Sequence, residues 1–234
     1  METLLEVHDI QTFIGQYHIL QGVSLSVCKG SVLALLGRNG AGKTTTLKTI
    51  LGLTPPREGE VIFGGRPIHE MRSFDIAALG IGFVPEQRAI FRDLSVEENL
   101  KIAERKRDDL QKKQELIFSL FPDLKRLIRL PGNHLSGGQQ QMLAIARALV
   151  PENELLLIDE PSEGLAPVLI EQMMNAIRML SAQTTVLLVE QNFRVASQLG
   201  NRYTIIENGR TVLDGEMAAL AADPPLIQRY LGAS

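Results

Sequence analysis

Short apolar runs recur along the chain, and most of them alternate with segments of helical spacing. The runs Leu-Leu-Leu-Ile at 155–158 and Val-Leu-Leu-Val at 186–189 contain no polar alternation, so we expect strands that are buried on both faces. Comparable runs lie at residues 4–7, 32–36, 61–63, 81–84 and 203–206. Strands of this kind form mainly parallel sheets covered by helices, so the predicted fold class is α/β.

Two further regions show different patterns. The first 30 residues and residues 57–68 have hairpin-like spacing with turn-forming glycines, which predicts a small antiparallel sheet beside the main one. Residues 94–130 have a helical pattern that begins with Ser95 and Glu98, the spacing of a capping box. The charged stretch 104–115 fits a solvated helix face, and contact with a partner or with lipid headgroups is the alternative.

A glycine-rich loop directly follows the apolar run 32–36. Residues 37–44 match G-x-x-x-x-G-K-[ST], the phosphate-binding loop of nucleoside triphosphatases. Glycines let consecutive backbone N–H groups turn toward a phosphate, where a side chain would collide with it. The predicted nucleotide-binding residues of this loop are Gly37, Arg38, Asn39, Gly40, Ala41, Gly42, Lys43, Thr44 and Thr45.

The last residues of this loop carry the charge and the metal ligand. Lys43 is expected to place its positive charge on the β- and γ-phosphates of ATP, and Thr44 to offer its hydroxyl to Mg²⁺. Thr45 is expected to contact the α-phosphate. The loop thus predicts ATP and Mg²⁺ as cofactors; a mere strand-to-helix turn is the alternative.

Two carboxylates end the apolar run 155–158. Asp159 and Glu160 follow it directly, at the position where parallel sheets place their ligands. In phosphate-loop enzymes the first carboxylate holds Mg²⁺, and the second can accept a proton from the attacking water or orient that water. Asp159 is therefore a predicted metal ligand and Glu160 a predicted catalytic base. Capping of the following helix by these two residues is the alternative.

Residues 135–139 read Leu-Ser-Gly-Gly-Gln and precede the helix-forming stretch 140–149. This pentapeptide, between the phosphate loop and the Asp-Glu pair, resembles the signature of the ATP-binding cassette (ABC) family. The resemblance implies a P-loop NTPase fold and a second anion site made by Ser136, Gly137, Gly138 and Gln139. In that family two subunits pack head to tail, so each nucleotide lies between one subunit's phosphate loop and the other's signature. A homologous or identical ABC subunit is thus the implied partner.

The chain departs from the family pattern at three positions. The usual glutamine of the Mg²⁺ site falls on Glu86, with Gln87 one position later, so either side chain is a candidate there. The switch histidine falls on Gln191, which can donate a hydrogen bond to the γ-phosphate but cannot carry a proton at neutral pH. Glu160 is therefore favoured over Gln191 as the base.

The third departure concerns the aromatic residue that stacks on adenine in the family. Its position aligns with Ile14, so Phe13 and Tyr17 are the neighbouring candidates for stacking on the base. Each of these two side chains could equally belong to the core.

Four segments, 84–86, 136–149, 161–167 and 189–192, resemble the smaller of two ATPases in bacterial importers of branched-chain and other hydrophobic amino acids. Urea or short-amide importers are the alternative. This resemblance implies a peripheral position on the cytoplasmic face of the cell membrane, transmembrane permease subunits, and indirectly a periplasmic or extracellular solute-binding protein. The loop 85–94, with Arg88, Phe91 and Arg92, is expected to form part of the permease groove. For Phe91, packing under the loop is the alternative.

Composition and length narrow the classes of protein to which this chain could belong. With 24 basic and 27 acidic residues the net charge is −3, so no basic field favours nucleic acid. A single cysteine excludes an internal disulfide, and neither an export signal nor a membrane-spanning apolar stretch is expected. ABC ATPases without a transport role usually carry coiled-coil insertions, zinc modules or tandem cassettes, none of which this sequence shows. We expect residues 1–234 to form one ABC ATP-binding domain, with residues 90–150 as its helical signature subdomain.

Overall fold

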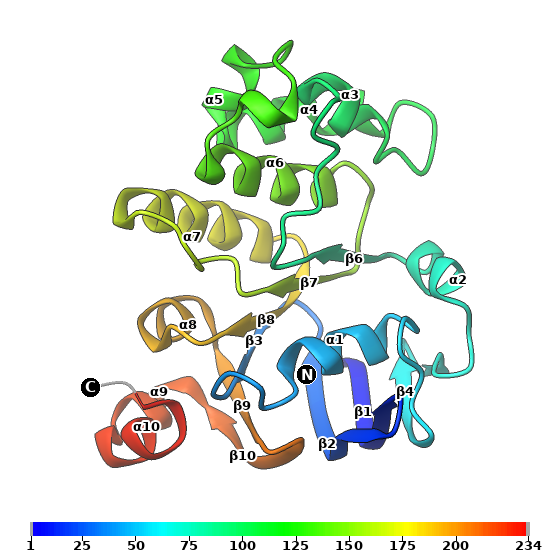
Figure 1. Ribbon diagram of the computed structural model, residues 1–234, viewed down its shortest axis with the longest axis vertical. Coiled ribbons are helices and arrows are strands. Elements are labelled where there is room, and N and C mark those ends of the chain that lie inside the picture. Colours follow the sequence, from blue (N-terminus) through cyan, green and yellow to red (C-terminus); the bar gives the residue numbers. More distant parts are fainter. Residues whose placement is uncertain (1, 233–234) are drawn as a thin grey trace.

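The computed structural model describes residues 2–232 and contains two β-sheets with helices around the larger one (Figure 1). The larger sheet has six strands in the order β10-β9-β3-β8-β7-β6, and the smaller has four in the order β2-β1-β4-β5. In the large sheet every pairing is parallel except that of β10 with β9. All pairings of the small sheet are antiparallel. The predicted α/β fold class with a separate antiparallel sheet is confirmed.

The large sheet comprises β3 (Val32–Leu36), β6 (Ile81–Val84), β7 (Leu155–Asp159), β8 (Thr185–Glu190), β9 (Arg202–Glu207) and β10 (Arg210–Glu216). The small sheet comprises β1 (Thr3–Ile14), β2 (Tyr17–Cys28), β4 (Glu58–Phe63) and β5 (Arg66–Pro67). The helices are α1 (Lys43–Ile50), α2 (Ser73–Ala78), α3 (Val96–Lys101), α4 (Asp109–Leu120), α5 (Pro122–Arg126), α6 (Gly137–Leu149), α7 (Pro167–Ser181), α8 (Phe193–Leu199), α9 (Met217–Ala221) and α10 (Pro224–Leu231), with a 3₁₀ turn at Gly132–His134.

Every residue of β3, β7 and β8 is buried, which explains why their sequences lack polar alternation. Alternate residues of one strand enter different cores. In β7, Leu156 packs into the cluster of α6 and α7, whereas Leu157 packs with α1 and the small sheet. The sheet is therefore held between two hydrophobic layers, and only its strand ends remain available for a polar site.

The helical pattern predicted for residues 94–130 is confirmed, and it is divided among three helices, α3, α4 and α5. The predicted capping box is present, because Ser95 Oγ accepts a hydrogen bond from Glu98 N–H and the Glu98 carboxylate accepts one from Ser95 N–H. α3 then ends, and α5 restarts at Pro122, which lacks the N–H that would continue a helix. These helices gather with α6 at one end of the molecule, far from the small sheet (Figure 1).

The expectation that the charges of 104–115 only face solvent is wrong for two residues. Asp109 is buried and its carboxylate accepts hydrogen bonds from the backbone N–H groups of Arg105 and Lys106. The Arg105 guanidinium donates to the carbonyl of Ile81 at 3.0 Å. Asp109 therefore stabilises the turn before α4, and Arg105 connects that turn to β6. Within residues 2–232, none of the helices has the length and apolarity needed to cross a bilayer.

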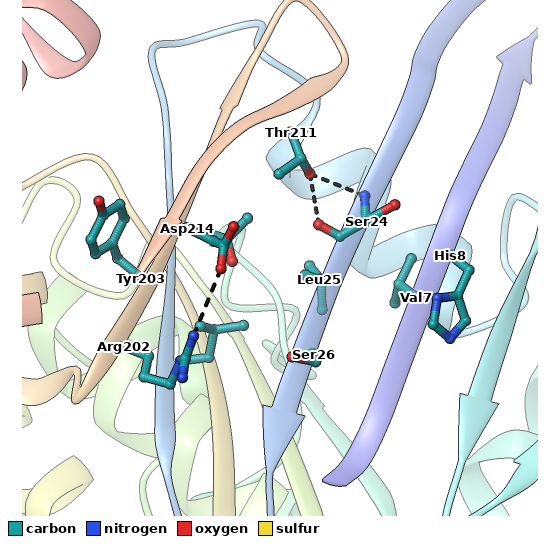
Figure 2. Close-up of a pocket in the computed structure, with 11 residues that line it drawn as sticks. Val7, His8, Ser24, Leu25, Ser26, Arg202, Tyr203, Thr211 and Asp214 are labelled. Carbon is teal, nitrogen blue, oxygen red and sulfur yellow. Dashed lines mark hydrogen bonds and ion pairs between the residues drawn. The ribbon is translucent and has the colours of Figure 1, made fainter. Parts of the chain in front are cut away.

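The two sheets meet along β2 and β10, beside a cleft of about 280 Å³ (Figure 2). Thr211 joins the strands, since its hydroxyl donates to the Ser24 carbonyl at 2.7 Å and accepts from Ser24 N–H at 3.0 Å. On the far side Arg202 pairs with Asp214 at 3.7 Å. Arg202 begins β9 and Leu33 lies near the start of β3, so this cleft lies at the amino ends of the parallel strands, away from the phosphate loop.

Candidate active site

The phosphate loop connects β3 to α1, and its glycines are required by the backbone. Gly37 has φ 151° and Gly42 has φ 110°, values that residues with a side chain rarely adopt. A Cβ atom on Gly37 would collide with the carbonyl of Ile206, and one on Gly42 would lie 2.7 Å from Leu20 Cδ2. The loop is thus packed between the end of β9 and β2, while Arg38, Asn39 and Gly40 are exposed.

Lys43 opens α1 and lies inside the site, with 4% of its surface exposed. Its ammonium group donates to the carbonyls of Gly37 at 2.9 Å and Arg38 at 3.2 Å. It also forms an ion pair with Glu160 Oε1 at 3.0 Å. The buried charge is therefore satisfied by three oxygens, and a phosphate would compete with them for the same group. Thr45 lies in the first turn of the same helix.

Thr44 and Asp159 meet although they are far apart in sequence. The Thr44 hydroxyl donates to Asp159 Oδ1 at 3.2 Å. Burial raises the pKa of Asp159 to about 6, the charges of Glu160 and Glu86 act in the same direction, and the Thr44 hydrogen bond and Lys43 oppose the rise. Asp159 does not cap a helix, because α7 begins at Pro167 with Ala166 as its N-cap. The capping alternative is therefore excluded.

Glu160 adopts a left-handed backbone conformation with φ 42°, which is uncommon for a residue with a side chain. Its N–H donates to the carbonyl of Val189 on β8 at 2.9 Å, and its own carbonyl accepts from Glu163 N–H. Strain of this kind persists where surrounding contacts fix the backbone, and it is common at functional sites. Here it directs the Glu160 carboxylate to Lys43.

Gln191 follows β8 and is exposed at the same edge of the sheet. The residue before it, Glu190, is 1% exposed and was not singled out by the sequence. The sequence feature that could have identified Glu190 is a carboxylate at the end of an otherwise apolar, buried strand. Glu190 accepts hydrogen bonds from Ser162 and Asn192, so it lies between the loop after β7 and the turn after β8.

The signature segment forms a self-contained start to α6. Ser136 is the N-cap, and its Oγ accepts from Gln139 N–H while Gln139 Oε1 accepts from Ser136 N–H at 2.9 Å. Gly138 is packed against Leu169, leaving no room for a side chain. Gly137 is exposed, and a Cβ there would lie 3.0 Å from the Arg88 guanidinium. Across residues 2–232, no hydrogen bond or ion pair joins the signature segment to the phosphate loop.

The two aromatic candidates for adenine differ sharply. The Phe13 ring stacks on His18 of β2 with centroids 4.1 Å apart, and the Arg57 guanidinium lies 4.0 Å from the same ring. Because β2 and β4 flank β1 on opposite sides and Arg57 directly precedes β4, both faces of Phe13 are occupied. Tyr17 begins β2 and is 67% exposed. Tyr17 is two residues before Ile19, and the carbonyl of Ile19 lies near Gly209 and near Gly42 of the phosphate loop. Tyr17 is thus the exposed aromatic residue of the pair on the strand that borders this loop.

The loop 85–94 rests on the signature helix. Arg147 of α6 donates to the Ala89 carbonyl at 2.6 Å and its guanidinium lies 4.8 Å from the Phe91 ring. Asn99 holds the backbone of Phe91 through both its side-chain oxygen and nitrogen. Phe91 remains 46% exposed, so it is not packed under the loop as a core residue.

A buried strand, a phosphate loop and a facing carboxylate pair together define a P-loop ATPase domain. Comparison with known proteins narrows this class: residues 20–163 match the family model described as ABC transporter. The chain belongs to the ABC transporter family, and it is an ATPase whose hydrolysis of ATP powers transport.

Individual relatives agree with this assignment. The chain is 40% identical over 232 residues to the high-affinity branched-chain amino acid transport ATP-binding protein BraG of Pseudomonas aeruginosa, covering 98% of this chain and 100% of that one. It is 36% identical over 204 residues to the probable branched-chain amino acid transport ATP-binding protein LivF of Archaeoglobus fulgidus, covering 86% of each.

Two solved structures are similar over nearly the whole chain. The ADP conformation of MJ1267, an ATP-binding cassette of an ABC transporter, has a TM-score of 0.85 at 26% identity and covers 100% of both chains. The dimeric post-hydrolysis state of the cassette MJ0796 bound to ADP and Pi has a TM-score of 0.81 at 25% identity, covering 92% of this chain and 99% of that one.

Proposed function

We propose that this subunit couples ATP binding and hydrolysis to uptake of branched-chain or other hydrophobic amino acids through a separate permease at the cytoplasmic face of the membrane. The observation that carries the substrate class is 40% identity to BraG over nearly the full length of both chains. The solute does not contact an ATPase subunit, so a solute-binding protein and the permease determine what is transported. A urea or short-amide importer is the second candidate, because segments 84–86, 161–167 and 189–192 also resemble those ATPases.

The ion pair between Lys43 and Glu160 explains how a nucleotide prepares the site. Phosphate oxygens carry more negative charge than the carbonyls of Gly37 and Arg38, so a triphosphate in the loop draws Lys43 toward itself. Glu160, which is 3.0 Å from Lys43, then loses a counter-charge. A carboxylate released in this way is free to orient the attacking water and to accept its proton. Gln191 donates a hydrogen bond to the γ-phosphate and does not act as a base.

The oxygens around Thr44 fit Mg²⁺. This hard cation prefers oxygen ligands and is held by one or two protein groups together with substrate phosphates. The Thr44 hydroxyl donates a hydrogen bond to the Asp159 carboxylate, so two oxygens suited to this cation already lie side by side. Thr44 and Asp159 would hold the ion, with Glu86 as a further candidate ligand, and Mg²⁺ would supply neutralisation of the charge on the phosphates.

The signature segment completes the site from a second cassette. Ser136 and Gly137 are exposed and have no contact with the phosphate loop of their own chain, so their anion site is directed outward. The dimer of MJ0796 bound to ADP and Pi supports a head-to-tail pair with an identical or homologous subunit. In such a pair each nucleotide is enclosed by two chains.

The test of the base is Glu160→Gln, which keeps the shape of the side chain and removes its basicity. ATP turnover should fall by roughly 10²- to 10⁴-fold while ATP affinity is retained, as expected for loss of a positioned base. Glu152→Gln, an exposed glutamate on the same domain, is the matched control and should hydrolyse normally. Wild-type turnover in Glu160→Gln would refute the assignment.

The test of the substrate class is uptake in a strain that lacks this gene. Uptake of labelled leucine, isoleucine and valine should be lost and restored by the wild-type gene but not by Glu160→Gln. Loss of urea uptake with normal amino-acid uptake would establish the second candidate instead.

A further inference from the structure

Glu190 is a buried carboxylate for which the proposed mechanism has no role. It is the last residue of β8, the strand between the phosphate-loop strand β3 and the Asp159 strand β7, and it is 1% exposed. In register it lies beside Leu36, one residue before the phosphate loop, and its neighbour Val189 lies beside Asp159. No ion pair to Glu190 is found within residues 2–232. Burying an uncompensated carboxylate is costly, so its hydrogen bonds must offset that cost.

Those hydrogen bonds come from two different loops. Oε1 accepts from Ser162 N–H at 3.2 Å, and Oε2 accepts from the Ser162 hydroxyl at 2.9 Å and from Asn192 N–H at 3.3 Å. Ser162 is two residues after Glu160, and Asn192 is one residue after Gln191. One side chain therefore holds the loop that carries the proposed base and the turn that carries the proposed γ-phosphate contact.

The backbone of Glu160 shows what this connection maintains. Its φ of 42° is strained, and the contacts that fix the loop include the bond from its own N–H to Val189 and the anchoring of Ser162 by Glu190. Burial raises the pKa of Glu190 to about 7, and the charge of Glu160 acts in the same direction, while the bonds from Ser162 and Asn192 oppose the rise. The N–H groups of Ser162 and Asn192 donate to different oxygens of Glu190, so a side chain with two acceptor oxygens is needed to satisfy both.

We propose that Glu190 is a positioning residue for ATP hydrolysis, which holds the Glu160 loop and the Gln191 turn in one fixed arrangement. The proposal rests on the roles assigned above to Glu160 and Gln191. Glu190 is 1% exposed and acts through the two segments that it joins.

The test compares four proteins: wild type, Glu160→Gln, Glu190→Gln and the double variant. In Glu190→Gln the amide has one oxygen, so either Ser162 N–H or Asn192 N–H faces an NH₂ group. The kcat per bound nucleotide should fall by about 10- to 100-fold, as for a lost hydrogen bond to a charged group, with KM within about 3-fold of wild type. In the double variant the additional loss of rate should be smaller than the loss in Glu190→Gln alone, because the base that Glu190 positions is gone and only its hold on the Gln191 turn remains to be lost.

Two results would overturn the proposal. The first is wild-type kcat in Glu190→Gln, and the second is a loss of kcat in the double variant that equals the product of the losses in the two single variants. Failure of the base assignment is recognised separately, because Glu160→Gln alone would then hydrolyse ATP. Glu207→Gln, at the exposed end of β9, a strand of the same sheet separated from β8 by β3, is the matched control and should retain wild-type kcat.

A second variant and a second measurement cover the case in which Glu190→Gln does not fold. Ser162→Ala removes one of the three donors and should lower kcat by about 3-fold with KM unchanged. Hydrogen exchange, which does not depend on hydrolysis, should be faster at the Asn192 amide in Glu190→Gln or, failing that protein, in Glu190→Asp. Unchanged kcat in Ser162→Ala together with unchanged exchange would contradict the proposal.

Discussion

The phosphate loop and the signature segment are both glycine-containing turns that open a helix, yet their helix starts differ. The phosphate loop ends at Gly42, the N-cap of α1, which has no side-chain cap, so backbone N–H groups stay available. In the signature segment the Ser136 and Gln139 side chains already satisfy each other's backbone. The start of α1 is therefore open to a ligand. At the start of α6 the backbone N–H groups of Ser136 and Gln139 are already occupied by these two side chains.

The surroundings differ in the same way. Lys43, Asp159 and Glu160 converge on the phosphate loop, so in the proposed mechanism one chain supplies the positive charge, the metal ligand and the base. The signature offers an exposed hydroxyl and the exposed Gly137, with the Arg88 guanidinium nearby. In the proposed function the loop therefore binds ATP by itself, whereas the signature completes a site on another chain.

Removing the positively charged side chain of Lys43 from the phosphate loop should have the largest effect. Lys43→Ala deletes the charge aimed at the β- and γ-phosphates and leaves Glu160 without its partner, so hydrolysis should fall by about 10³-fold. Isothermal titration should show ATP affinity reduced by about 10- to 100-fold, the range for a lost charge-assisted hydrogen bond. Lys48→Ala, an exposed lysine of the same helix, should leave both quantities unchanged. Tight ATP binding by Lys43→Ala would show that the loop does not depend on its lysine.

A charge in the signature should separate hydrolysis from binding. Gly137→Asp places a carboxylate in the first turn of α6, where it favours the helix but repels a phosphate. Hydrolysis should fall by about 10²-fold while the ATP affinity of the single chain stays within about 2-fold of wild type. Gly137→Asn has the same shape without the charge and should retain most activity. Weakened ATP binding by the isolated Gly137→Asp chain would place the signature in its own chain's site.

The two aromatic candidates give a smaller expected effect. Tyr17→Ala should raise the Kd for ATP by about 10-fold, since stacking of a base on an aromatic ring contributes about 1–3 kcal/mol. Phe13→Ala should change that Kd by less than about 2-fold and lower thermal stability instead, because the ring packs between His18 and Arg57. If Phe13→Ala weakens ATP binding and Tyr17→Ala does not, Phe13 is the stacking residue.

The smallest expected effect concerns pH. Burial raises the pKa of Glu190 from 4.5 to about 7, so the folded protein binds more protons than the unfolded chain between these values. The free energy of unfolding should therefore fall as pH increases through this window, by at most about 3 kcal/mol. The charge of Glu160 acts on Glu190 in the same direction. Denaturant titrations with EDTA should show this slope in wild type and a flatter one in Glu190→Gln; equal slopes would contradict it.

Local features of the sequence were sufficient for the strands, the phosphate loop and the capping box at Ser95. Apolar runs such as Val32–Leu36 report burial directly, and the glycines at Gly37 and Gly42 report a backbone that no other residue adopts. The signature was identified by resemblance, and its capping geometry follows from Ser136 and Gln139, three residues apart.

What the sequence did not indicate depends on contacts between distant residues. The Lys43–Glu160 ion pair joins positions on two elements, and Glu190 becomes a connecting residue only because β8 lies beside β7. Similarly, the sequence alone left Phe13 as a candidate for stacking on adenine. The structure places Arg57, from the other side of β1, at the second face of its ring. Pairings of this kind follow from the order of strands, which no single motif specifies.

The central claim, that the loop of one chain works with the signature of another, is tested most directly by mixing two inactive variants. Lys43→Ala lacks a working loop and Gly137→Asp lacks a working signature, but a mixed pair contains one site in which both are intact. At concentrations that allow pairing, the mixture should hydrolyse ATP at least 10-fold faster than either variant alone, the gain expected when an intact set of transition-state contacts is restored. A mixture no faster than the average of its two components would contradict the account.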